Sequence, residues 1–240
     1  MHILVLQHER VEHPGVFRDF LREDGHAWDA IELDEGEKLP ANADGYDALW
    51  VLGGPMDTWQ EDMHPWLGDE KEFIREAVLN RGMPYLGLCL GHQLLAEALG
   101  GTVGPSDHPE IGVMDVHLTE AGSSGVLFDG LPESFDCLQW HSAEIKTVPE
   151  GSRILAYSGK CAVQALKWGT RAYSMQFHVE IEADTVQNWN GIPEYAGALD
   201  RELGPEAVRD LDEACAIRMK SFNERAERIY INWLQAVART

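Results

Sequence analysis

The first hundred residues alternate short apolar runs with longer amphipathic stretches. The apolar runs predict buried strands over 3–6, 28–33, 48–52 and 85–88. Apolar residues three or four positions apart predict helices over 16–21, 70–78 and 91–99. Strands that alternate with helices are typical of βαβ units, so this part of the chain predicts a parallel sheet.

The remaining residues follow two other patterns. From 102 to 173, turns and short extended runs predict an antiparallel elaboration of the sheet. From 208 to 237, apolar residues again recur three or four apart, which predicts a long C-terminal helix with one apolar face. We expect this face to pack on the chain's own sheet, or else to form an interface with a partner or a second copy.

Together these patterns predict an α/β fold, with a mostly parallel sheet flanked by helices, an antiparallel elaboration and a C-terminal helical extension. The chain has 240 residues, 44% of them hydrophobic and 25% charged, which is enough apolar material for one generous core. We therefore expect a single domain over 1–240, with its core at 1–181 and the helical extension at 182–240.

Charge and hydropathy argue against several classes of partner. The 41 acidic and 19 basic residues give a net charge of -22, which repels nucleic acids and anionic lipid surfaces. No apolar run approaches the ~20 residues of a membrane-spanning helix, and the first residues lack the pattern of a secretory signal. We expect a cytoplasmic protein that binds neither nucleic acid nor membrane.

The four cysteines lie far apart and form no C-x-x-C pair, so we expect free thiols, with no metal site and no disulfide framework. Cys89 differs from the other three because it is flanked by Gly87 and Gly91 between a predicted strand and a predicted helix. A tight strand-to-helix turn would project its sulfur above the sheet, and the helix N-terminus would favour the thiolate. This context favours a nucleophile over a small buried hydrophobe; we interpret Cys137, Cys161 and Cys215 as buried structural residues.

A cysteine nucleophile needs a base, and the base needs a group that orients it. His178 and Glu180 are two residues apart at the end of an expected strand over 173–177, so their side chains would point to the same side. A carboxylate beside the imidazole would fix its tautomer and stabilise the imidazolium. We interpret the other nine histidines, including His8 and His13, as surface residues that bind no metal.

Three segments carry a resemblance to a known family: Gly87-Leu88-Cys89-Leu90-Gly91-His92-Gln93, His178-Val179-Glu180 and Gly53-Gly54-Pro55. In this order they resemble the class I, triad-type glutamine amidotransferases, over roughly residues 1–181. Within that family the chain is similar to the free-standing, GMP-synthase-like group. The resemblance implies a flavodoxin-like fold and hydrolysis of the glutamine side-chain amide through a γ-glutamyl thioester, without a cofactor.

The resemblance also implies roles for individual residues. Cys89 would be the nucleophile, His178 the base and Glu180 its orienter. The oxyanion would be held by the backbone N–H groups of Gly54 and Leu90. Residues expected to contact the substrate are Gly53, Pro55, Gln93, Trp140, His141 and Ser142.

The sequence has no G-x-x-x-x-G-K-[ST] loop and no S-G-G-x-x-S string, so for an amidotransferase we expect a separate synthase to accept the ammonia.

Two other functions are alternatives to a glutamine amidotransferase. The same chemistry would make the protein a γ-glutamyl peptidase or hydrolase, with a larger leaving group held near 57–66 and Trp140-His141. A non-catalytic module that kept the fold is disfavoured, because all three triad residue types are present.

Overall fold

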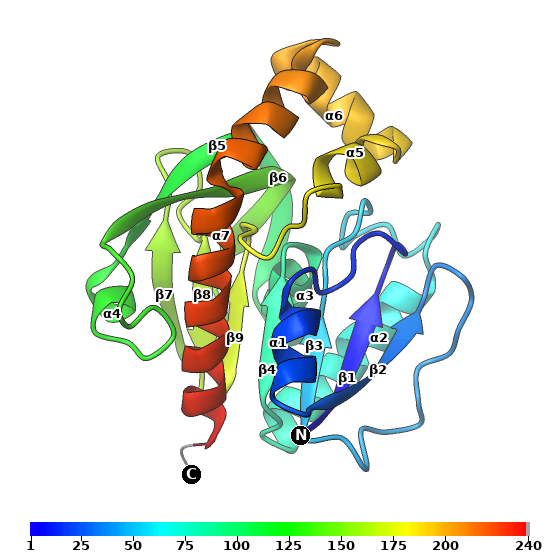
Figure 1. The fold of residues 1–240 in the computed structure, drawn as a ribbon. Helices are drawn as coiled ribbons and strands as arrows, with labels where there is room; N and C mark the ends of the chain where they lie inside the picture. The colour runs from blue at the N-terminus through cyan, green and yellow to red at the C-terminus, as the bar shows by residue number, and fades with distance from the viewer. Residues whose placement is uncertain (239–240) are drawn as a thin grey trace.

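A nine-stranded sheet runs through the protein, whose computed structural model describes residues 1–238 (Figure 1). Its parallel half has the order β2 (Ala27–Glu32), β1 (His2–Gln7), β3 (Ala48–Val51), β4 (Tyr85–Leu88) and β9 (Ala172–Met175). The antiparallel half continues with β8 (Ala165–Trp168), β7 (Ser152–Tyr157), β5 (Thr102–Leu118) and β6 (Ser134–Thr147). The parallel half has the flavodoxin-like strand order, which confirms the predicted fold class.

Helices cover both faces of the parallel half. On one face lie α1 (Phe17–Glu23) and the long α7 (Ala207–Ala238); on the other lie α2 (Trp66–Arg75), its π-helical continuation (Glu76–Asn80) and α3 (Leu90–Ala98). Residues of β1 alternate between the two layers, because Ile3 and Val5 pack with α1 and α7 whereas Leu4 and Leu6 pack with α2 and α3. The continuous apolar runs therefore mark strands buried on both faces.

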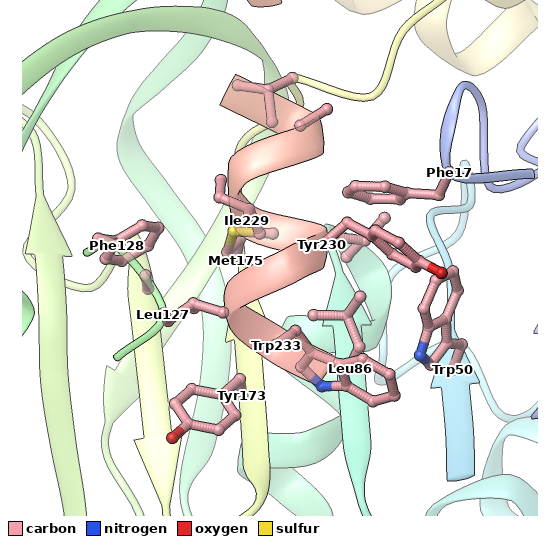
Figure 2. Close-up of a cluster of buried hydrophobic side chains, with 14 of the residues drawn as sticks. Phe17, Trp50, Leu86, Leu127, Phe128, Tyr173, Met175, Ile229, Tyr230 and Trp233 are labelled. Atoms are coloured by element: carbon pink, nitrogen blue, oxygen red, sulfur yellow. The ribbon is translucent and has the colours of Figure 1, made fainter. Parts of the chain in front are cut away.

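The C-terminal half of α7 buries its apolar side on the chain's own sheet (Figure 2). Trp233 packs edge-on against Trp50, with ring centroids 5.4 Å apart, and its Nε1 donates a hydrogen bond to the carbonyl oxygen of Tyr85 at 3.1 Å. Tyr230 stacks on Phe17. Of the two uses expected for this apolar face, intramolecular packing is the one seen, and α7 is a single unbroken helix.

Three shorter helices complete the fold. α4 (Glu120–Ser123) follows β5, while α5 (Thr185–Asn190) and α6 (Pro193–Leu203) lie between β9 and α7. Figure 1 shows α5 and α6 together beyond the ends of the strands, beside the first turns of α7. Within residues 1–238, no helix is both long and apolar enough to cross a membrane.

Candidate active site

The segments that follow four neighbouring parallel strands meet at one edge of the sheet. β1 is followed by His8 and Glu12, β3 by Gly53-Gly54-Pro55, β4 by Cys89, and β9 by His178. In open α/β sheets, ligands bind in the crevice outside the carboxyl ends of the strands. The topology thus brings together the segments that the sequence analysis singled out.

Cys89 lies in the tight turn between β4 and α3. Within residues 1–238 it is the one non-glycine residue with a positive φ, 50°, a strained conformation that surrounding structure must impose. A Cβ on Gly91 would lie 2.0 Å from the carbonyl oxygen of Val51, and one on Gly87 would lie 2.6 Å from that of Gly91. Both positions therefore require glycine, and the turn has the form that the sequence predicts.

His178 connects Cys89 to Glu180. Its Nδ1 lies 2.6 Å from Oε1 of Glu180, and its ring also hydrogen bonds with the Cys89 side chain. Burial lowers the pKa of His178, but Glu180 and Cys89 outweigh burial and hold that pKa well above its ordinary value. The three candidate triad residues are therefore in contact in the order thiol, imidazole, carboxylate.

The imidazole of His178 is held from two sides. The backbone of His178 pairs with that of Leu138 in β6. The N–H of His178 donates to the carbonyl oxygen of Leu138 at 2.9 Å, and the N–H of Leu138 donates back at 3.0 Å. Trp189 of α5 packs edge-on against the ring, with centroids 4.7 Å apart. His178 and Glu180 lie just beyond the strand, as expected, although β9 ends at Met175 rather than at residue 177.

Gly54 and Leu90, the two candidate oxyanion residues, both line the cavity that contains Cys89. Their backbone N–H groups donate to no other group in the described part of the chain. Leu90 is the first residue of α3, where the helix dipole adds partial positive charge. Free donors beside a nucleophile are what an oxyanion hole requires, so the geometry is compatible with the expected roles.

A buried ion pair fixes the backbone next to Gly54. The carbonyl oxygen of Gly53 lies 2.9 Å from Nδ1 of His8, and Nε2 of His8 lies 2.9 Å from Oε1 of Glu70. Burial lowers the pKa of His8, but Glu70 more than compensates, so the pKa is raised overall. Gly53 does not itself line the cavity; its carbonyl anchors the loop.

The cavity has a volume of about 290 Å³. It is lined by five of the residues expected to contact substrate: Pro55, Gln93, Trp140, His141 and Ser142. Nε2 of Gln93 donates to Oε1 of Gln176 at 3.0 Å, and Nδ1 of His141 donates to the carbonyl oxygen of Ala143 at 2.9 Å. These bonds hold the two side chains in fixed orientations at the cavity wall.

Behind His141 lies the one group of metal-ligand type within residues 1–238, Glu110, His141 and Cys161, whose ligand atoms lie within 4.8 Å of one another. The Glu110 carboxylate already accepts hydrogen bonds from Oγ of Ser158 at 2.8 Å and from Nε2 of Gln164 at 2.6 Å. It also lies 3.3 Å from Nε2 of His141. These contacts fix the Glu110 carboxylate beside His141, so we assign Glu110 to positioning that side chain.

The interpretation of the other histidines as surface residues is wrong for three of them. His8, His92 and His141 are at most 4% exposed. His92 lies between Oγ of Ser174 at 2.8 Å and the carbonyl oxygen of Val163 at 3.1 Å, and burial lowers its pKa to about 3. Each of the three has polar partners brought by distant segments, which the sequence does not reveal.

One wall of the cavity comes from α6, which the sequence analysis did not single out. This helix contributes Pro193, Glu194, Tyr195, Ala198 and Arg201. The spacing 194, 198, 201 would have predicted one helix face, but nothing in the sequence says what that face covers.

Glu12 is a second feature that the sequence analysis missed. This residue is 3% exposed, and its side chain accepts a hydrogen bond from the hydroxyl group of Tyr195. The side chain also packs against Gly53, because a Cβ on that glycine would lie 2.4 Å from Oε2 of Glu12. The pKa of Glu12 is raised to about 7, chiefly by burial. His178 and Tyr195 lower this pKa, but each by less than burial raises it. A buried carboxyl group therefore joins α6 to the loop that carries Gly54.

The fold and the site define a class of enzymes: flavodoxin-like proteins with a cysteine on a strand-to-helix turn and a His–Glu pair after a later strand. The chain belongs to the class I glutamine amidotransferase family, whose model, Glutamine amidotransferase class-I, matches residues 21–187. The expected enzyme class, a cysteine-nucleophile amidohydrolase of this family, is confirmed.

Individual relatives agree with this assignment. The chain is 31% identical to the glutamine amidotransferase-like protein YfeJ of Salmonella typhimurium over 95% of both chains. It is 41% identical to a glutamine-hydrolyzing GMP synthase subunit of Methanocaldococcus jannaschii, but that match covers 44% of this chain and 55% of the archaeal one. The crystal structure of a glutamine amidotransferase from Thermotoga maritima has a TM-score of 0.85 at 27% identity, over 100% of this chain and 99% of that one.

Proposed function

We propose that the protein hydrolyses the side-chain amide of L-glutamine to glutamate and ammonia, through a γ-glutamyl thioester on Cys89. The observation that carries the proposal is the contact order Cys89, His178, Glu180 beside the free N–H groups of Gly54 and Leu90. Nucleophile, base, orienter and oxyanion donors are the parts that this reaction class needs.

Each part has one chemical task in the proposed reaction. The Cys89 thiolate attacks the amide carbonyl carbon, and the N–H groups of Gly54 and Leu90 stabilise the resulting oxyanion. The imidazolium of His178 gives its proton to the leaving nitrogen, so ammonia departs and the thioester remains. His178 then takes a proton from water, which attacks the thioester and releases glutamate, while Glu180 holds the imidazole.

The proposed fate of the ammonia is transfer to a separate acceptor enzyme. Similarity to the glutamine-hydrolyzing GMP synthase of Methanocaldococcus jannaschii, which is itself one subunit, supports this role, as does the lack of nucleotide-binding strings in the sequence. A partner that orders the loop 53–56 would complete the catalytic geometry only in the assembled state. Co-purification from the native cell, followed by glutaminase assays with and without the bound protein, tests this role; full turnover by the chain alone contradicts it.

A specific observation favours the second candidate, hydrolysis of γ-glutamyl peptides. A further cavity of about 550 Å³, lined in part by His64 and Asp34, adjoins the one at Cys89. The residues that line both cavities are Pro55, Met56, Gln60, Pro193 and Glu194. A leaving group larger than ammonia would find room there, next to the loop that carries Gly54.

A substrate screen with the purified protein separates the two candidates. Glutamine, glutathione and γ-glutamyl dipeptides are compared, with glutamate and ammonia measured separately. Glutamate and ammonia in equal amounts from glutamine support the amidotransferase function. Glutamate without ammonia, from peptides only, supports the peptidase, and no glutamate from any of them refutes both.

A further inference from the structure

α6 lies outside the family match at 21–187, yet it forms a wall of the cavity at Cys89. Glu194, Ala198 and Arg201 are spaced four and three residues apart, so they share one face of the helix, and all three line the cavity. The hydroxyl group of Tyr195 bonds to Glu12, and its carbonyl oxygen accepts from Nε1 of Trp140 at 3.3 Å. The helix is therefore a fixed part of the site.

The two ends of α6 lie over different parts of the cavity. Glu194, near its start, shares the cavity rim with Pro55 and Met56 of the oxyanion loop. Leu203, at its end, lies 4.0 Å from where a Cβ of Gly112 would be, and Gly112 pairs with Gln139, the residue before Trp140. Arg201, two residues before Leu203, is thus on the side of strand β6, which carries Trp140, His141 and Ser142.

Arg201 is the one lysine or arginine among the cavity residues, and the acidic residues there are Asp57 and Glu194. Within residues 1–238 its guanidinium makes no ion pair and no hydrogen bond. Its Nη1 lies 3.3 Å from where a Cβ of Gly197 would be, so the side chain lies back along the helix over that glycine. A helix-interior glycine costs about 1 kcal/mol relative to alanine, and here it leaves room for the guanidinium.

The chemistry of a γ-glutamyl substrate supplies a partner for this group. With its δ-carbon at Cys89, the amino acid end of the substrate points away from the turn and carries one carboxylate. Carboxylates are disfavoured near a chain of net charge -22 unless a local cation binds them, and the planar guanidinium fork matches a carboxylate with two parallel hydrogen bonds. Resting on the proposed γ-glutamyl hydrolysis, we propose that Arg201 binds the α-carboxylate of the substrate and selects γ-glutamyl compounds in which it is free.

The test compares Arg201→Met with wild type on two substrates, L-glutamine and L-glutaminamide, in which the α-carboxylate is an amide. Hydrolysis of the γ-amide gives ammonia with glutamate from the first and with isoglutamine from the second. We expect wild type to prefer glutamine, and Arg201→Met to raise the KM for glutamine roughly 10- to 100-fold with kcat nearly unchanged. The variant should lose the preference for glutamine over glutaminamide, and Arg201→Lys should be intermediate.

Arg209→Met is the matched control, because Arg209 is an exposed arginine on α7 outside the cavity. An unchanged preference in Arg201→Met overturns the proposal. The proposal is also overturned if Arg201→Met hydrolyses glutamine like wild type but no longer hydrolyses γ-glutamylglycine. That result would assign Arg201 to the carboxylate of the leaving group.

A binding measurement separates this proposal from the proposed function. Calorimetry with the Cys89→Ala protein should detect glutamine binding that the additional Arg201→Met change weakens by a similar factor. If wild type hydrolyses no γ-glutamyl compound but binding still depends on Arg201, the proposed function fails and the assignment of Arg201 stands. Absence of glutamine binding to Cys89→Ala overturns the assignment.

Discussion

The cavity beside Cys89 has two walls that are built in different ways. The inner wall consists of the loop after β3, the Cys89 turn with the start of α3, and residues 140–143 of β6. It holds the proposed nucleophile and the two proposed oxyanion donors. The outer wall is one face of α6, which reaches the cavity through packing among Trp140, Trp189 and Tyr195. The inner wall lies within the family match at 21–187, whereas the outer wall lies outside it.

The largest effect should come from the inner wall. Cys89→Ala removes the nucleophile, and we expect loss of amide hydrolysis by about a million-fold, near the limit set by loss of a whole triad. The fold should survive, because alanine fits wherever cysteine does. Cys215→Ala, which changes a buried thiol on α7, is the control and should keep turnover. Wild-type turnover by Cys89→Ala would leave the G-x-C-x-G turn with a packing role only.

The next effect distinguishes the base from its orienter, the two residues after β9 that lie behind Cys89. His178→Ala should cost several orders of magnitude in kcat, because both proton transfers go through this ring. Glu180→Gln should cost less, roughly 100- to 10,000-fold, since an amide still hydrogen bonds Nδ1 at the 2.6 Å position but does not stabilise the imidazolium. The measurement is kcat for both variants on glutamine, and equal, negligible losses would refute the triad.

The two walls also differ in how far the sequence predicts them. The turn at Cys89 is predictable because its cause is local: Gly87 and Gly91 permit the close approaches that the strand-to-helix turn needs. Most strands of the parallel half are predictable too, because runs buried on both faces are continuous and apolar. By contrast, Arg201 and Glu12 have ordinary sequence neighbours, and their importance comes from contacts across 183 residues, as between Glu12 and Tyr195. Such contacts depend on tertiary packing, which no local pattern encodes.

A smaller effect concerns the carboxyl group that joins the walls. The pKa of Glu12 rises from 4.5 to about 7 in the folded protein, chiefly through burial, so the folded state holds this proton more tightly than the unfolded state. Wild type should therefore lose stability relative to Glu12→Gln as the pH rises from 4.5 to about 7, by on the order of 3 kcal/mol, with no further change above. Urea unfolding of both proteins across this range measures the difference, and a difference that does not vary with pH would contradict the assignment.

The smallest effect compares two glycines, one beside each wall. Gly91, in the first turn of α3 behind the inner wall, has no room for a Cβ, whereas a Cβ on Gly197 in α6 would meet only the end of the Arg201 side chain at 3.3 Å. Gly197→Ala should therefore stabilise the protein by up to about 1 kcal/mol through helix propensity, provided that the guanidinium moves by a few tenths of an ångström. Because that movement displaces the group proposed to bind the α-carboxylate, the KM for glutamine should rise modestly, by less than in Arg201→Met, while kcat stays constant. Thermal unfolding and steady-state kinetics of the same preparation measure both quantities. If Gly197→Ala is more stable but has an unchanged KM, the space at Gly197 does not serve substrate binding by Arg201.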